Sequence, residues 1–158
     1  MGAFAVQIAK ACGATVTGVG SGKHRDFAIS IGASEFINYE QQDFAELDQR
    51  WDVVFDAAGK SSYGEAKHVL KSGGSYVSTE PSLRGLFMPL ATLPLERRGK
   101  VMLARPRGDD LRELMQLYAA ENLHACVERV FPLEEAAEAH RWIEAQGFCG
   151  KLVLKVGS

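Results

Sequence analysis

The segment WDVVFDAAG, at residues 51–59, constrains the fold of this chain more than any other stretch. Its centre, Val53-Val54-Phe55, is apolar at consecutive positions, which predicts a strand that is covered on both faces. Before and after it, β-branched and apolar runs alternate with segments whose apolar residues recur at helical spacing. Alternating strands and helices are typical of a parallel sheet with right-handed crossovers. We therefore predict an α/β fold built on a parallel sheet.

The boundaries of the predicted elements follow from these patterns and from stop signals. Strands are predicted at residues 15–19, 36–39, 53–55, 75–79, 100–104, 125–130 and 151–156. Helices are predicted at residues 5–12, 23–31, 43–47, 62–71, 111–118 and 136–143. Ser62 and Glu65 form a capping-box pattern, and Gly73-Gly74 predicts a turn from helix to strand. The prolines at 81, 89 and 94 predict an irregular connection over Glu80–Gly99, with room for one short helix.

Charge and cysteine content argue against several classes of function. The net charge of −2 leaves no global positive field for nucleic acid or acidic membranes. No apolar run approaches the roughly 18 residues of a membrane span. The three cysteines, Cys12, Cys126 and Cys149, are scattered, so we expect neither a disulfide framework nor a zinc site from them. We predict a cytoplasmic protein that binds no nucleic acid, membrane or metal.

Three features favour a nucleotide ligand, and each also has a plainer interpretation. Gly2 begins the first helix, whose free N–H groups suit a pyrophosphate; a frayed end of the chain is the alternative. The turn Gly20–Arg25 offers a hydroxyl and three basic side chains and has no carboxylate before Asp26. This composition suits a 2′-phosphate, and a solvated turn is the alternative. Asp56–Gly59 ends the central strand with small residues, either where ligands of open α/β sheets bind or as a simple turn.

Several stretches, taken in order, resemble one family. They are GAFAVQIAKACGATVTGV, IGASEFINY, WDVVFDAAG, SGGSYVST and ERVFPLEEAAEAHRWIEAQGFCGKLVLKV. Together they extend over essentially the whole chain. Their order closely resembles the medium-chain dehydrogenase/reductase superfamily, specifically its zinc-free quinone oxidoreductase-like branch. The resemblance implies a doubly wound, Rossmann-type parallel sheet and NADPH as the cofactor.

The resemblance also implies which residues face the cofactor. Ser21 matches the Ser or Thr that contacts the 2′-phosphate in NADPH-preferring members. His24 stands where several members have Lys, and basic residues flank it. The full set of matches is Gly2 at the phosphate loop; Ser21, Lys23, His24, Arg25 and Tyr39 at the 2′-phosphate; Ala58, Gly59 and Thr79 by the nicotinamide ribose; and Lys151 near the cofactor cleft. The catalytic residues stay unknown, because the family's substrate-facing groups lie mostly in its amino-terminal domain.

Compared with the family pattern, the chain lacks the first strand of the sheet and most of the glycine-rich loop. Gly2 matches the last glycine of that loop, and Met1 stands where Val is usual. We therefore expect an amino-terminally truncated NAD(P)-binding domain over residues 1–131. Residues 132–158 correspond to a helix and strand of the otherwise absent catalytic domain. A misplaced start codon or a truncated gene is the expected origin; translation of the upstream DNA tests this, and a stop codon just before Met1 would contradict it.

Loss of a central strand predicts a divided sheet and low stability. Such a strand buries apolar side chains worth roughly 8–15 kcal/mol, which is about the whole stability of a domain. It also leaves two inner strand edges without hydrogen-bond partners. We predict a marginally stable chain unless its carboxyl-terminal strand or a partner chain fills the gap.

The predicted function is that of an NADPH-dependent oxidoreductase fragment, inactive or impaired alone, whose parent enzyme transfers a hydride to a quinone or an enone. One alternative is a non-catalytic module that binds a nucleotide or pairs with another subunit, and a third possibility is a product without activity. The resemblance further implies a homodimer through Lys100–Ala104. Leu86-Phe87-Met88 covers the substrate cleft, covers that interface, or packs in the core.

Overall fold

The chain divides into two units, each of which is assembled from segments that lie apart in the sequence. The computed structural model describes residues 1–79, 88–93, 95–102, 105–145 and 149–157. Unit 1 comprises Met1–Gly2, Val19–Gly22 and Ile37–Leu111, and unit 2 comprises Ala3–Gly18, Lys23–Phe36 and Arg112–Ser158. The domain boundary between residues 131 and 132 stays a prediction.

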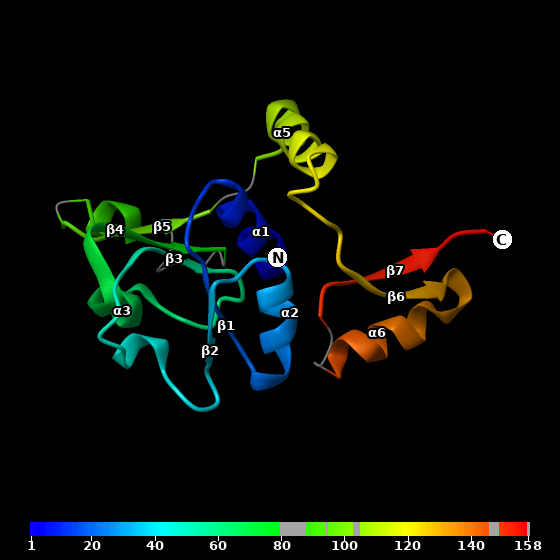
Figure 1. Cartoon of the computed structure of the whole chain (residues 1–158), viewed down its shortest axis with the longest axis horizontal. Helices are drawn as coiled ribbons and strands as arrows, with labels where there is room; N and C mark the ends of the chain where they lie inside the picture. Colours follow the sequence, from blue (N-terminus) through cyan, green and yellow to red (C-terminus); the bar gives the residue numbers. More distant parts are fainter. Residues whose placement is uncertain (80–87, 94, 103–104, 146–148, 158) are drawn as a thin grey trace. The chain divides into compact units, whose positions relative to one another are not determined.

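Strands and helices alternate along the chain, as predicted (Figure 1). The strands are β1 (Thr17–Gly20), β2 (Glu35–Asn38), β3 (Trp51–Asp56), β4 (Leu70–Ser78), β5 (Arg98–Val101), β6 (Val127–Pro132) and β7 (Lys151–Lys155). The α-helices are α1 (Gly2–Ala11), α2 (Arg25–Ser30), α3 (Tyr63–Ala66), α5 (Gly108–Ala119) and α6 (Ala136–Glu144). Short 3₁₀ turns form η1 (Gly22–His24), η2 (Phe44–Glu46), η3 (Lys67–Val69) and η4 (Leu133–Glu135). The predicted α/β class is confirmed.

Unit 1 contains a three-stranded sheet in the order β3–β4–β5, and both pairings are parallel. Trp51 at the start of β3 pairs with Leu70. Two residues later, Val53 pairs with Ser75, so β4 carries extra residues between these two pairings. Gly73, at φ +77°, lies in this irregular part of the strand. Gly73-Gly74 therefore belongs to β4 itself, whereas the sequence predicted a turn ahead of the strand.

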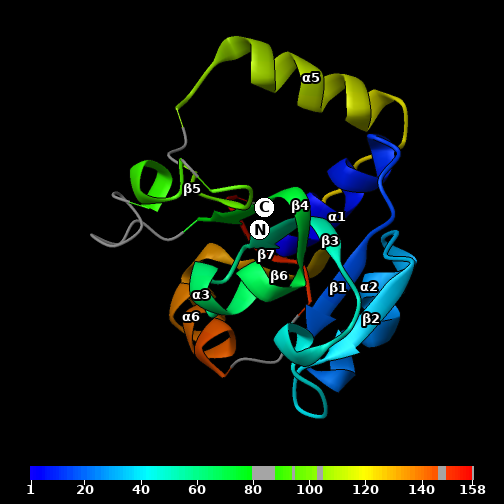
Figure 2. The ribbon, with the colours of Figure 1, turned by 90° about the vertical axis from the view of Figure 1, so that its left-hand side faces the viewer.

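The core of unit 1 lies where α3 and η3 meet this sheet. Ala66 and Leu70 are fully buried, and Tyr76 is 2% exposed. The residues packed against them are Phe44, Val54, Tyr63 and Met88. α3 begins with the predicted capping box, in which the Glu65 carboxylate accepts the Ser62 N–H at 2.8 Å. α3 also contacts β4, and the two are close in Figure 2.

One face of β3 is open, which corrects the prediction that both of its faces are covered. Val53 is 58% exposed and Phe55 is 37% exposed. Val54, between them, packs on the core. Because alternate side chains of a strand point to opposite faces, the core lies on the Val54 side alone.

The remaining strands form two separate pairs, β1–β2 and β6–β7. The predicted division of the sheet is therefore confirmed: within the described ranges, no strand joins β1–β2 to β3–β4–β5. β7 pairs in parallel with β6, with Leu154 opposite Phe131. Within the described ranges β7 pairs with no strand of the other two sheets, so the carboxyl-terminal strand, one of the two predicted ways to fill the gap, is not paired there.

In unit 2, α6 packs against the β6–β7 pair (Figure 1). Phe131 is 1% exposed. The Arg129 guanidinium lies 4.5 Å from the Phe131 ring centroid and 4.6 Å from that of Trp142. This stacking adds a cation–π contribution to the small core of the β6–α6–β7 segment.

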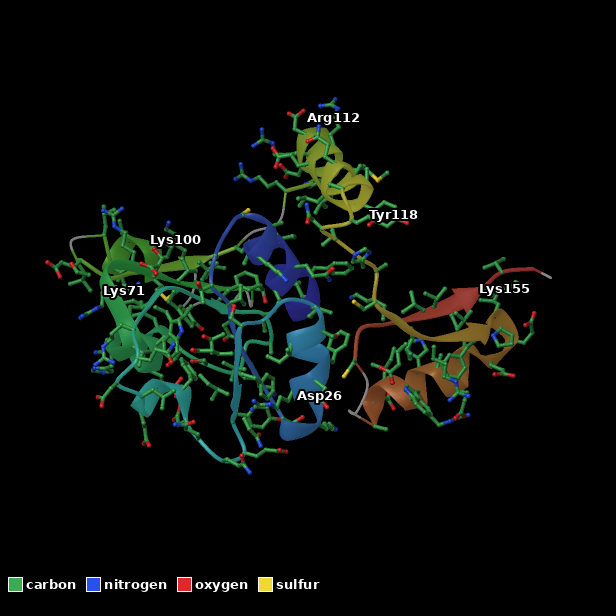
Figure 3. All side chains as sticks on the ribbon, in the orientation of Figure 1. Asp26, Lys71, Lys100, Arg112, Tyr118 and Lys155 are labelled. Atoms are coloured by element: carbon green, nitrogen blue, oxygen red, sulfur yellow. The ribbon has the colours of Figure 1, made fainter. Side chains whose placement is uncertain are left out.

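A buried glutamine joins two other parts of unit 2. Gln7 on α1 is 4% exposed. Its Oε1 accepts the His124 N–H at 2.7 Å, and its Nε2 donates to the His124 carbonyl at 3.2 Å. By contrast, no residue of α5 is buried. Figure 3 labels Arg112 and Tyr118 on this helix, and Tyr118 is 58% exposed.

Several boundaries differ from the predicted ones because local turns compete with regular helix. The helix predicted at 23–31 begins as η1, and the one predicted at 43–47 is the single turn η2. β5 begins two residues before the predicted start at Lys100. Most of the Glu80–Gly99 connection before Met88, including Leu86 and Phe87, lies outside the described residues, as do residues 103–104. None of the helices described is long and apolar enough to cross a bilayer.

Candidate cofactor site

The turn that follows β1 is the first candidate for cofactor binding. Ser21 in this turn is 5% exposed. The Gly20 carbonyl accepts the Tyr39 N–H at 3.1 Å, so the ends of β1 and β2 lie together in unit 1. A Cβ at position 22 would lie 2.9 Å from Asn38 Nδ2, the far end of a flexible side chain on β2. The turn is therefore packed closely against the end of β2.

A carboxylate from the end of β2 reaches this turn. Glu40 Oε2 accepts the Gly22 N–H at 3.2 Å, and the Glu40 N–H is donated to Asn38 Oδ1 at 3.1 Å. The sequence order of the turn, with no acidic residue before Asp26, did not reveal this neighbour. Glu40 directly follows β2, and the carboxyl ends of neighbouring parallel strands lie at one edge of a sheet, which is the signal that sequence reasoning missed.

The other residues predicted at the 2′-phosphate differ in their setting. Tyr39 belongs to unit 1 and is 60% exposed, so its ring is accessible to a ligand. Lys23, His24 and Arg25, the last residues of the predicted turn, belong to unit 2. Lys23 and Arg25 are exposed and His24 is half-buried. The structure thus brings Tyr39 to the Ser21 turn, and the role of the three basic residues stays a prediction.

The turn after β3 is the second candidate, and Asp56 organises it. The Asp56 Oδ1 atom accepts the Ala58 N–H at 3.1 Å and the Lys60 N–H at 3.3 Å. Its Oδ2 atom accepts the Ser61 N–H at 3.0 Å. The Tyr76 hydroxyl lies 3.0 Å from Oδ2 and 2.8 Å from the Ser61 carbonyl oxygen, and both are acceptors. One carboxylate thus holds the backbone of residues 58–61.

The protonation states of Asp56 and Tyr76 follow from these contacts. Burial raises the pKa of the Asp56 carboxyl, but the hydrogen bonds from Ser61, Tyr76 and the other donors outweigh it and lower that pKa below its usual value of 3.8. Burial, together with the Asp56 carboxylate, raises the pKa of the Tyr76 hydroxyl to about 12. At neutral pH Asp56 is therefore an ionised acceptor and Tyr76 a protonated donor.

The predicted ribose-side residues gather at this second turn. Gly59 has φ +64°, a conformation that favours glycine. Thr79 bonds to the Asp56 carbonyl through its N–H at 3.2 Å and through its hydroxyl at 3.3 Å. Gly2 also lies here, because a Cβ placed on it would be 3.8 Å from Ala57 Cβ. Small residues thus line this turn beside the first residue of α1, while the Asp56 carboxylate already accepts the N–H groups of Ala58, Lys60 and Ser61.

Lys151 belongs to unit 2, whereas the residues of the turn after β3 belong to unit 1. It lies on β7 in unit 2, where its Nζ is 5.9 Å from the centroid of the Phe4 ring. Its N–H is donated to the Cys126 carbonyl at 2.7 Å. Lys151 is therefore engaged within unit 2, and its role near a cofactor stays a prediction.

Comparison with known proteins identifies relatives along nearly the whole chain. The family model described as zinc-binding dehydrogenase matches residues 31–154. A 2-haloacrylate reductase from Burkholderia sp is 30% identical, with 98% of this chain and 52% of the relative covered. The chain thus spans about half the length of the curated relatives it matches.

Comparison with solved structures also finds quinone oxidoreductases. The quinone oxidoreductase of Coxiella burnetii matches with a TM-score of 0.82 and 30% identity, covering 98% of this chain and 49% of that one. The Escherichia coli quinone oxidoreductase in complex with NADPH matches with a TM-score of 0.74 and 25% identity, covering 98% and 53%. These matches support the fold class and the quinone oxidoreductase-like relationship.

The family's description mentions zinc, and the described part of this chain offers no donor set that would hold it. Across the residues that the structure describes, no three His, Cys, Asp or Glu side chains gather where they could hold a metal ion. Structural and catalytic zinc sites need such a cluster. No step of the chemistry is therefore assigned to zinc.

Proposed function

The chain belongs to the zinc-binding dehydrogenase family, and on that basis we propose that it binds NADPH and serves hydride transfer to a quinone or an enone. The observation that carries the proposal is the placement of Gly2, the first residue of α1, against Ala57 in the turn after β3. A helix start with free N–H groups and a partial positive charge suits a pyrophosphate. Because Gly2 and Ala57 are both small, a cofactor could approach the backbone between them.

We propose that the residues singled out by the family resemblance contact the two halves of the cofactor. Ser21 offers a hydroxyl at the 2′-phosphate, and Lys23 and Arg25 offer charge-assisted hydrogen bonds from the segment that follows it. Asp56 fixes the turn that carries Ala58 and Gly59, which we place beside the nicotinamide ribose. NADPH, when bound, supplies the hydride itself. The chain's own part is to bind, orient and exclude water.

Binding and turnover assays on the full chain test this proposal. NADPH and NADH are titrated while tryptophan fluorescence is recorded, and loss of reduced nicotinamide absorbance is followed with a quinone or an enone present. Saturable NADPH binding with turnover supports the oxidoreductase. Absence of binding by either nucleotide contradicts the proposal.

A second candidate, a non-catalytic module that binds a nucleotide or pairs with another subunit, is favoured by the open face of β3. Val53 and Phe55 there are substantially exposed, and a partner chain would cover them. NADPH binding without turnover supports this candidate and the prediction that the chain is inactive or impaired alone.

We also propose a homodimer through Lys100–Ala104. In the described ranges β5 pairs only with β4, which leaves its other edge for a strand of a second copy. Lys100 is labelled on β5 in Figure 3. Analytical ultracentrifugation tests this pairing, and a monomer at all concentrations contradicts it. A cytoplasmic location also stays a prediction from the scattered cysteines.

A further inference from the structure

The Glu40 carboxylate accepts a hydrogen bond from a backbone N–H group in the turn after β1. Its Oε2 atom accepts the Gly22 N–H at 3.2 Å. Gly22 begins η1 and immediately follows the buried Ser21. A 2′-phosphate bound at Ser21, as the proposed function has it, would need hydrogen-bond donors such as this adjacent N–H group. In this chain that N–H already donates to a carboxylate of the protein itself, Glu40.

The backbone around Glu40 favours this position. Its own N–H is donated to Asn38 Oδ1 at 3.1 Å, and the Gln41 and Gln42 N–H groups are both donated to the Asn38 carbonyl at 3.0 Å. These bonds form a tight turn directly after β2. A Cβ at position 22 would lie 3.9 Å from Glu40 Oε2, which is an ordinary contact distance, so the carboxylate lies directly against the Gly22 backbone.

We propose that Glu40 is a specificity-determining residue that weakens the hold of this turn on a 2′-phosphate and so limits the preference for NADPH over NADH. The inference rests on the proposed function, because it assumes that the nucleotide's 2′ position lies at the Ser21 turn. A phosphate that takes the Gly22 N–H must displace the carboxylate, and the displaced carboxylate remains a nearby like charge. A nucleotide with a free 2′-hydroxyl meets neither penalty.

The charge of Glu40, rather than its size, carries this effect. Glu40 is exposed, so water and salt screen it in part. We expect Glu40→Gln to raise affinity for a 2′-phosphorylated nucleotide about tenfold, which corresponds to about 1.4 kcal/mol. The gain is expected to shrink at about 1 M salt, where the Debye length falls to about 3 Å.

The experiment measures binding of adenosine 2′,5′-bisphosphate and of 5′-AMP to the full chain by calorimetry. These two probes differ only at the 2′ position and need no nicotinamide chemistry. Glu46→Gln is the matched control, because it removes the same charge from another exposed glutamate of unit 1, on η2. The unfolding midpoint of each variant is measured in parallel.

The proposal predicts that Glu40→Gln binds the bisphosphate about tenfold more tightly, while its affinity for 5′-AMP and both affinities of Glu46→Gln are unchanged. Equal bisphosphate affinity in wild type and Glu40→Gln would overturn it, although the proposed function would stand. Weaker 5′-AMP binding by Glu40→Gln would also overturn it, since Glu40 would then be a ligand of the ribose hydroxyls. Absence of binding of either probe to wild type and to the variant would overturn both proposals.

Discussion

Replacement of Asp56 by asparagine is expected to loosen the turn after β3 and to destabilise unit 1. The two carboxylate oxygens each face two donors: Ala58 and Lys60 N–H on one, Ser61 N–H and Tyr76 O–H on the other. In Asp56→Asn an NH₂ group replaces one oxygen, so two donors then face another donor. Hydrogen bonds to charged groups contribute about 1.5–3 kcal/mol each, and the Tyr76 hydroxyl recovers part of the loss by turning to the Ser61 carbonyl.

We therefore expect Asp56→Asn to lower the free energy of unfolding by about 2–4 kcal/mol. For a chain of this size the melting temperature would fall by about 5–15 °C. Urea denaturation followed by circular dichroism measures the change. Asp52→Asn is the matched control on the same strand, since Asp52 is exposed and its ion pair with Lys71 at 2.8 Å lies at the surface. Equal losses of stability in the two variants would contradict the role of the Asp56 carboxylate in holding this turn.

The pH dependence gives a second test of the same network. The folded-state pKa of Asp56 is lower than its usual value of 3.8, so its stabilising contribution is present above that value and is lost as pH falls through the folded-state pKa. The difference in stability between wild type and Asp56→Asn should shrink in this acid range. A difference that is independent of pH down to the acid transition would show that the carboxylate charge is not responsible.

Three further predictions concern other residues of the two turns and of α1. Ser21→Ala is expected to weaken NADPH binding about fivefold to tenfold and to leave NADH binding unchanged, measured by calorimetry; equal losses for both nucleotides would contradict the assigned role. Tyr76 has a pKa raised to about 12, so its contribution to stability is present below pH 10 and is lost as pH rises through the folded-state value; Tyr76→Phe should lack this alkaline loss in urea titrations. Gln7→Ala leaves the His124 N–H and carbonyl without their side-chain partner and should cost about 1–3 kcal/mol, with faster hydrogen exchange at the His124 amide; unchanged exchange would contradict the bridge.

Local sequence patterns predicted local structure well. The Ser62–Glu65 pattern formed its capping box because both partners lie within one helical turn. The alternation of strands and helices likewise predicted the parallel pairings of β3 with β4 and β4 with β5. In contrast, Gly73-Gly74 lies within β4, because pairing with β3 extends the strand through residues that by themselves favour a turn.

The candidate site was predictable only in part for a similar reason. Asp56 lay in a stretch already singled out, yet its role depends on Tyr76, which is 20 positions away in the sequence and reaches it through the neighbouring strand. Glu40 reaches Gly22 only because β1 and β2 end side by side. Residues that act through tertiary pairing leave little trace in the local pattern. The openness of Val53 and Phe55 depends in the same way on which segments lie against β3.

We propose that the turn after β1 binds the 2′-phosphate of NADPH. A thermal melt of the full 158-residue chain, alone and with NADPH or NADH, tests it most directly. A ligand that binds only the folded state adds about 2.7 kcal/mol at about 100 times its dissociation constant. We expect a cooperative melt whose midpoint NADPH raises more than NADH does at equal concentration. A melt that neither nucleotide shifts, or that both shift equally, would contradict it.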